Sequence, residues 1–149
     1  MIKLNLPEYS FRIQKSSKGP QIFDSIRKKF VALTPQEWVR QNFIQYLIAE
    51  KKYSSSLISV EAGLKYIRLQ KRSDIKVHDR KGIVWMIVEC KAPDVQLSQA
   101  TFNQLSTYNV SGKTKARFLA ITNGLIHYCC ELNSAQTGYD FLKDFPDFP

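Results

Sequence analysis

The chain has 149 residues, of which 44% are hydrophobic, and it carries a formal net charge of +9. This length and composition suit one globular domain with a real core, and they exclude a disordered tail. No apolar run reaches the roughly 20 residues that span a bilayer. The three cysteines, two of them adjacent, make a poor disulfide framework. We therefore expect a cytoplasmic protein with reduced thiols and no membrane partner.

Positive charge is concentrated between residues 65 and 81. Seven Lys and Arg residues lie there against two acids, Asp74 and Asp79. Such a cluster concentrates polyanions near the surface and favours a nucleic acid as partner. The alternative is a solvated basic face that serves only solubility.

The first 30 residues predict a hairpin-like N-terminal extension. Apolar residues in an extended pattern lie within positions 4–13, and a second such segment covers positions 21–26. The intervening residues 16–20 are rich in turn formers.

A helix is predicted from about residue 35 to residue 50. Thr34 suits the N-cap, Pro35 suits the first helical position, and Glu37 would complete a capping box with Thr34. An apolar row at helical spacing marks the side toward the core: Val39, Phe43, Tyr46 and Leu47. This helix is expected to open the core, residues 31–132.

Three strands are predicted next, over residues 57–66, 73–78 and 83–91. Turn-forming residues 79–82 connect the last two, so the three should form an antiparallel meander. Residues 84–88 are apolar without alternation, which is typical of a strand covered on both faces. This strand is expected at the centre of the sheet.

A second helix over residues 98–110 is followed by two further strands, 117–122 and 125–132, around the turn Asn123–Gly124. The residues expected on the buried side of this helix are Phe102, Leu105, Tyr108 and Asn109. Residues 133–149 are expected to form a tail that packs along the surface. The predicted fold class is α/β of the α+β type, with one mixed central sheet flanked by helices.

Charged residues end the apolar strand. Because successive side chains of a strand face opposite ways, Glu89 and Lys91 share one face while Cys90 points to the other. Asp74 lies on the preceding strand, and the hairpin would bring it beside Glu89. Buried charges require a partner or a metal, so these residues predict either a structural ion pair or a site.

The same residues suit a divalent cation. Oxygen ligands are those that Mg²⁺ prefers, so Asp74, Glu89 and the main-chain carbonyl of Cys90 predict a magnesium site, with Mn²⁺ as a substitute. Such an ion polarises a phosphate oxygen and activates a bound water, and Lys91 would orient that water. The pattern thus predicts catalytic roles for Asp74, Glu89 and Lys91 in phosphodiester hydrolysis.

Asp74, fourteen further residues and then Glu89-Cys90-Lys91 resemble the motif of the PD-(D/E)XK nuclease superfamily, whose fold has the same order of elements. Ser73 stands where that motif has a proline, a common substitution that leaves the metal carboxylate intact. The resemblance implies a restriction-endonuclease-like core.

Three segments resemble, more narrowly, the N-terminal nuclease domain of the type I restriction enzyme R subunit and its short stand-alone relatives. They are residues 71–75, 88–93 and 119–124, and the likeness covers about residues 28–131. It implies a single nuclease-like domain over residues 1–149 that hydrolyses DNA.

This family has a Gln-x-x-x-Tyr motif on the helix after the catalytic lysine, and Gln104 and Tyr108 supply it. Residues four apart lie on one side of a helix, so both are expected to contact DNA or support the site, as are Lys71 and Arg72. For Gln104 and Tyr108 the alternative is an ordinary half-buried helix face.

Two further acids are candidates for the metal shell through water. In related nucleases an acid of the first helix has this place, which points to Glu37; its alternative is the helix cap. Glu61, on the first core strand, is a candidate if its register allows, and otherwise it is an exposed strand charge.

The chain contains no Gly-x-x-x-x-Gly-Lys-Ser/Thr phosphate loop, so the ATP-driven motor of the R subunit is not expected within it. The expected partners are DNA and restriction-modification subunits or a separate motor protein. Cleavage of both strands needs two sites and favours a homodimer or two recruited copies. The alternatives are a non-cleaving nucleic-acid-binding or assembly module, and an enzyme acting on RNA or on nucleic-acid ends.

Two histidine positions invite other interpretations. Residues 127–130, His-Tyr-Cys-Cys, suggest zinc, but paired sulfur ligands normally stand two to four residues apart and the sequence has no second cluster. Buried strand thiols are the stronger prediction. His78 is expected at a solvated strand end, with a hydrogen bond near phosphate as the alternative.

Overall fold

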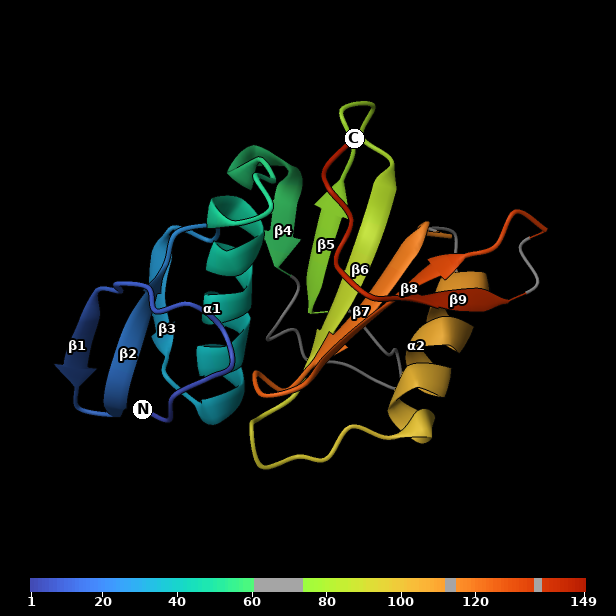
Figure 1. Cartoon of the computed structure of the whole chain (residues 1–149). Coiled ribbons are helices and arrows are strands. Elements are labelled where there is room, and N and C mark those ends of the chain that lie inside the picture. The colour runs from blue at the N-terminus through green and yellow to red at the C-terminus, as the bar shows by residue number, and fades with distance from the viewer. Residues whose placement is uncertain (61–73, 112–114, 136–137) are drawn as a thin grey trace.

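The computed structural model of the chain describes residues 1–60, 74–111, 115–135 and 138–149 (Figure 1). This part of the chain forms a mixed α+β structure with two α-helices and two β-sheets. The predicted α+β class is confirmed, and the N-terminal strands form a sheet of their own. None of the helices in these ranges is long and apolar enough to span a bilayer.

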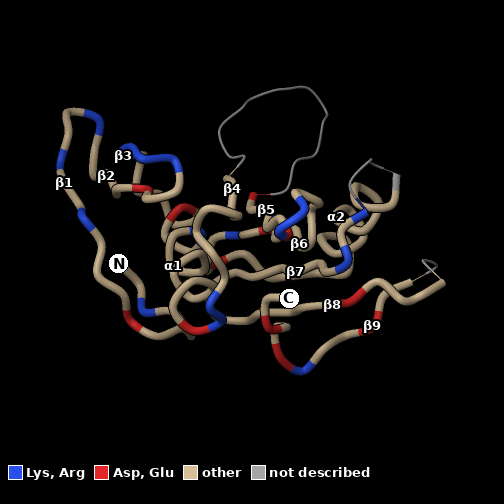
Figure 2. The backbone as a smooth tube through the Cα atoms, turned by 90° about the horizontal axis from the view of Figure 1, so that it is seen from above, with Lys and Arg blue, Asp and Glu red and all other residues tan. Residues whose placement is uncertain are grey.

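The N-terminal sheet has the strand order β1-β2-β3 and is antiparallel throughout. Its strands are β1 (Ile13–Ser16), β2 (Gly19–Asp24) and β3 (Lys29–Ala32). The predicted hairpin is confirmed, although its first strand begins only at Ile13. The sequence pattern does not predict β3, because four residues after a charged turn are too few to establish a period. Figure 2 shows this sheet beyond α1, on the far side of that helix from the larger sheet.

The larger sheet has the strand order β4-β5-β6-β7-β8-β9. The strands are β4 (Ile58–Val60), β5 (Ile75–His78), β6 (Val84–Cys90), β7 (Phe118–Thr122), β8 (His127–Leu132) and β9 (Tyr139–Leu142). The predicted meander is confirmed, since β4, β5 and β6 pair antiparallel. Strand β6 pairs in parallel with β7, which places both at the centre.

Strand β9 lies within the predicted tail and is not predicted by the sequence pattern. It pairs antiparallel with β8 and ends the sheet. Only four residues long and with one of them charged, β9 gives a weak strand signal, and pairing with β8 supplies the missing stabilisation.

Helices α1 (Pro35–Ala49) and α2 (Gln99–Ser111) cover opposite faces of the larger sheet. On β6, Met86 and Val88 belong to the core under α1, whereas Ile87 packs with Leu105 of α2. Side chains of a strand alternate between faces, so β6 contributes to both cores. The prediction of a central strand covered on both faces is confirmed.

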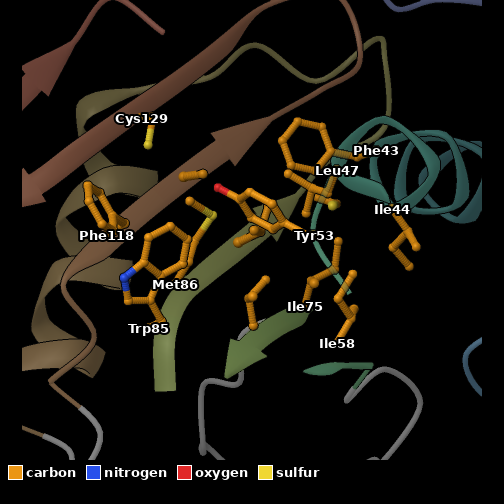
Figure 3. Close-up of a cluster of buried hydrophobic side chains, with 14 of the residues drawn as sticks. Phe43, Ile44, Leu47, Tyr53, Ile58, Ile75, Trp85, Met86, Phe118 and Cys129 are labelled. Carbon is orange, nitrogen blue, oxygen red and sulfur yellow. The ribbon is translucent and has the colours of Figure 1, made fainter. Parts of the chain in front are cut away.

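The larger core lies between α1 and the sheet (Figure 3). Phe43 and Leu47 of α1 meet Ile75 of β5 and Met86 of β6, and all four side chains are fully buried. Each such side chain contributes roughly 1.5–3 kcal/mol when it leaves water. This core holds β5 and β6 in place, and the candidate site lies at their ends.

The C-terminal tail closes this core. The ring of Phe145 lies 5.2 Å from that of Phe43, and the ring of Phe148 lies 5.6 Å from that of Trp85. The Tyr53 hydroxyl donates a hydrogen bond to a main-chain carbonyl of the tail at 2.6 Å. The tail therefore packs along the surface as predicted and also contributes to the core.

Glycine occupies a left-handed position in both predicted hairpin turns. Gly82 has φ +84°, and the Asp79 carboxylate accepts two main-chain N–H groups within the same turn at 2.8 and 3.0 Å. Gly124 has φ +87°, and a Cβ there would lie 2.7 Å from a methyl group of Leu4. Both turns thus require the conformational freedom of glycine, and the second also requires its small size.

Candidate functional site

Asp74 and Glu89 lie at the same end of two neighbouring strands. Ile75 of β5 pairs with Val88 of the antiparallel strand β6. Asp74, just before Ile75, and Glu89, just after Val88, therefore occupy the next position at the same end of the two strands. The Asp74 carboxylate accepts a hydrogen bond from the main-chain N–H of Cys90 at 2.7 Å, through Oδ2. The prediction that the hairpin brings the two acids onto adjacent strands is confirmed.

Lys91 lies beside Glu89. Its Nζ is 3.2 Å from Glu89 Oε2, and the side chains are 26% and 6% exposed, respectively. Cys90 points the other way, into the core under α1. Burial raises the pKa of its thiol well above the ordinary value, and the nearby carboxylates add to this effect, so Cys90 carries no charge. The predicted division of faces along this strand is correct.

Asp74 is also held by an arginine that the sequence analysis does not single out. Arg40, on α1, donates from Nη2 to Asp74 Oδ1 at 2.9 Å, and its Nη1 contacts Glu37 Oε1. Arg27 donates to Glu37 Oε2 at 2.9 Å and pairs with Asp24. We call these five residues, which alternate in charge, the charge chain.

The two side chains at the centre of the charge chain are almost inaccessible to solvent. The side chain of Arg40 is 6% exposed and that of Glu37 is 8% exposed. Burial alone would lower the pKa of Arg40, but the carboxylates of Asp74 and Glu37 more than offset this and raise it. A buried cation is tolerated only when it is paired in this way. Arg40 therefore stays charged and fixes the position of the Asp74 carboxylate.

Glu37 differs from its prediction. Its main-chain N–H donates to the Thr34 hydroxyl at 3.0 Å, so the N-cap is confirmed. Its carboxylate does not complete the capping box, because it accepts from Arg27, Arg40 and Gln41, while the Thr34 N–H donates to a main-chain carbonyl. These contacts give no support to a place for Glu37 in a metal shell.

The main-chain carbonyl of Cys90 has a partner from α1. Gln36 Nε2 donates to it at 2.8 Å. A carbonyl oxygen has two lone pairs, so this bond leaves a second direction open. Gln36 thus joins Arg40 in tying α1 to the end of β6.

The candidate ligands for a cation at this end of the sheet are oxygen atoms. Within the described part of the chain, no three His, Cys, Asp or Glu side chains converge closely enough to hold a metal ion. The oxygen groups predicted to hold a cation are the carboxylates of Asp74 and Glu89 and the Cys90 main-chain carbonyl. Magnesium sites commonly have this form, since the ion keeps several waters and takes one or two carboxylates.

The comparisons with known proteins assign the chain to a family. Residues 35–146 match the profile of the type I restriction enzyme R protein N terminus (HSDR_N). The chain belongs to this family. The match spans both helices and the larger sheet, whereas the N-terminal sheet β1–β3 lies outside it. The curated proteins contain no match.

The resemblance to the N-terminal domain of the type I restriction enzyme R subunit is thereby confirmed, while the likeness to the PD-(D/E)XK superfamily and the roles of the motif residues stay predictions. Gln104 is exposed on α2, and Tyr108 is half-buried against the core under that helix. Lys71, Arg72 and Glu61 lie outside the described residues.

The histidine and cysteines of β8 are engaged in packing. Both ring nitrogens of His127 have partners, Thr122 Oγ1 at 2.7 Å and the Asn5 carbonyl at 2.9 Å. Burial raises the pKa of the Cys129 thiol to about 12 and that of Cys130 to about 11. The prediction of buried strand thiols is confirmed. His78 is half-exposed, and its ring lies 3.4 Å from a main-chain carbonyl.

Sequence reasoning missed the residues of α1 that support the site. Arg40 lies three residues after Glu37, a spacing that places the two on one side of a helix, and this is the signal that could have found the pair. Gln36 and Arg27 give no comparable signal, because their partners are distant in sequence or belong to a turn.

Proposed function

We propose that this chain is a Mg²⁺-dependent endodeoxyribonuclease module with a restriction-endonuclease-like core of the PD-(D/E)XK type. One observation supports the proposal: the Asp74 carboxylate accepts the N–H of Cys90 at 2.7 Å, and Glu89 and Lys91, which flank Cys90 in sequence, pair with each other at 3.2 Å. Membership of the R protein N-terminal family supports DNA cleavage as the reaction.

The donor set fits a small divalent cation. Asp74, Glu89 and the Cys90 main-chain carbonyl would hold Mg²⁺, or Mn²⁺ as a substitute, and waters would complete the shell. When bound, the ion polarises the scissile phosphate and lowers the pKa of a bound water. Lys71, Arg72, Gln104 and Tyr108 are proposed to contact the DNA or support the site.

Lys91 is proposed to act on the reacting water. Its side chain is 26% exposed, against 12% for Asp74 and 6% for Glu89, so it is the most open of the three. An ammonium in this position donates hydrogen bonds to the attacking water or to the phosphate as negative charge develops. Arg40 acts indirectly, because its bond to Asp74 keeps that carboxylate turned toward the end of β6.

The proposed partners follow from the family. DNA is the substrate, and other restriction-modification subunits or a separate motor protein are the assembly partners. The 149 residues contain no phosphate-loop motif, so ATP-driven translocation is not proposed for them. A homodimer would supply the second site that cleavage of both strands requires.

The test is plasmid cleavage with matched variants. Supercoiled plasmid is incubated with Mg²⁺ or Mn²⁺ and with the unchanged protein, Asp74→Ala, Glu89→Gln or Lys91→Ala. The controls are Asp140→Ala and Lys143→Ala, which change the charge in the same way at exposed positions on or just after β9. We expect cleavage by the unchanged protein and both controls, at least about 100-fold slower cleavage by the site variants, and none with EDTA.

A second candidate function is a non-cleaving nucleic-acid-binding or assembly module. It is favoured by the pairing of both acids with cations, since Arg40 holds Asp74 and Lys91 lies beside Glu89. A purely structural ion-pair cluster would look like this. If the unchanged protein and all variants leave the plasmid intact while binding DNA with the same salt dependence, this function replaces the nuclease.

A further inference from the structure

The turn between β2 and β3 presents lysines outside the segment matched by the family. We call residues 25–29 the basic turn. Residues 12–29 contain six Lys and Arg and one acid, Asp24, which is fully buried. Lys28 and Lys29 are exposed, and within the described ranges neither forms an ion pair. Their charge is therefore directed to solvent.

The basic turn has a defined conformation. Asp24 Oδ1 accepts the N–H groups of Ile26 and Arg27 at 2.8 and 3.0 Å. The N–H of Lys28 donates to the Asp24 carbonyl at 2.7 Å, and Lys28 has φ +58°. Left-handed backbone is costly for a residue with a side chain, so the bonds from Asp24 must hold it there. The two lysines thus project from a preorganised turn.

The basic turn is linked to the candidate site. Arg27, within the turn, lies 2.9 Å from Glu37, Glu37 contacts Arg40, and Arg40 lies 2.9 Å from Asp74. Three consecutive ion pairs therefore separate the turn from the acid of the site. Figure 2 shows Lys and Arg at the turns of the N-terminal sheet, which lies beyond α1.

We propose that the basic turn binds the phosphate backbone of duplex DNA next to the cleavage position, through Lys28 and Lys29. The choice of DNA rests on the proposed function, and the net charge of +9 suits a polyanion. Lysines recognise phosphate as point charges and read no bases, so the contact positions the duplex independently of its sequence. The charge chain would hold this contact at a constant distance from Asp74.

Salt dependence of binding measures such a contact. Each phosphate neutralised on duplex DNA contributes about 0.9 to the slope of log K against log salt concentration. The test variant is Lys28→Asn/Lys29→Gln, in which asparagine tolerates the left-handed position. The matched control is Lys3→Gln/Lys143→Gln, which removes two charges from exposed positions outside the basic turn and outside residues 65–81. All proteins carry Asp74→Ala, so that the duplex is not cleaved during the titration.

Binding is measured by fluorescence anisotropy with a labelled duplex over a range of salt concentrations. We expect the slope to fall by about 1.8 in the basic-turn variant and to change little in the control. The variant Lys28→Arg/Lys29→Arg should keep the original slope. An unchanged urea midpoint shows that each variant is folded.

Three results would overturn the proposal: equal slope losses in both double variants, no loss in the basic-turn variant, or equally tight binding of polyglutamate through the same lysines. A slope loss confined to the basic-turn variant supports it even if the plasmid assay shows no cleavage. Cleavage with an unaltered slope in the basic-turn variant rejects this inference and leaves the nuclease proposal standing.

Discussion

The two helices beside the candidate site lie in different surroundings. Helix α1 lies between the larger sheet and the N-terminal segments, and it buries charged and amide side chains, including Arg40 and Gln41. Helix α2 packs on the sheet through one side and leaves Gln104 exposed. The side of the site next to α1 is therefore closed and held by ion pairs, and we call it the closed flank. The side next to α2 is open, and we call it the open flank.

This difference separates two tasks. The closed flank fixes a carboxylate, because Arg40 and the Cys90 N–H leave Asp74 little freedom. The open flank leaves Lys91 and the face of α2 accessible to a large substrate. The proposed nuclease function requires both a fixed carboxylate and an open approach for the substrate.

The largest expected effect is at Arg40. Arg40→Met leaves the carboxylates of Asp74 and Glu37 buried without their shared cation, and removal of one partner from a buried pair costs about 3–5 kcal/mol. The free energy of unfolding in urea measures this loss. Gln104→Met on α2 is the control and should change it by less than about 0.5 kcal/mol.

A double-mutant cycle sharpens the Arg40 prediction. Asp74→Asn should cost less in the Arg40→Met background than in the unchanged protein, because the unpaired charge is then removed. Equal stabilities of Arg40→Met and Gln104→Met would show that the closed flank does not depend on the charge chain. If Arg40→Met does not fold, Arg40→Lys, which keeps the charge, replaces it in the cycle.

A smaller effect is expected at the anchor of the open flank. Asn109, the fully buried polar residue of α2, bonds both main-chain groups of Ala116 at 2.7 and 3.0 Å and the Tyr139 hydroxyl at 2.8 Å. Asn109→Ala leaves buried polar groups unsatisfied and should cost about 2–3 kcal/mol in urea unfolding. Asn103→Ala, at an exposed position of the same helix, is the control. Coincident unfolding curves for these two variants would contradict the assignment of Asn109 as an anchor.

The third effect is confined to acidic pH and concerns His127, on the closed flank. A carbonyl can only accept, so His127 Nε2 donates to Asn5, and the neutral ring leaves Nδ1 to accept from the Thr122 hydroxyl. Burial lowers the pKa of His127 from 6.5, although the Asn5 bond acts in the opposite direction. The unfolded chain therefore binds a proton more readily, and stability should fall as the pH drops below 6.5 toward the folded pKa.

Thermal unfolding midpoints measured across this pH range check the His127 prediction. His127→Gln should lose this part of the pH dependence. The second histidine of the chain, His78, supplies the control His78→Gln, which should keep it. A pH profile of His127→Gln that parallels that of the unchanged protein would count against the buried neutral ring.

Much of the fold follows from local patterns. Helix α1 starts at Pro35 as its cap predicts, and β6 is central as its unbroken apolar run predicts. Strands β3 and β9 escape prediction because each has four residues and is stabilised mainly by the strand it pairs with. The adjacency of Asp74 and Glu89 is predictable because a single hairpin connects their strands.

The sequence by itself determined the order of the elements, the hairpin beside the site and the family, since periodicity, caps and motif spacing all act over short distances along the chain. Only the tertiary structure decided that Arg40 lies between Glu37 and Asp74 and that the N-terminal sheet reaches this cluster through Arg27. Such pairings depend on which surfaces are buried together. The local sequence around a charged residue does not reveal which distant partner will offset the cost of burying it.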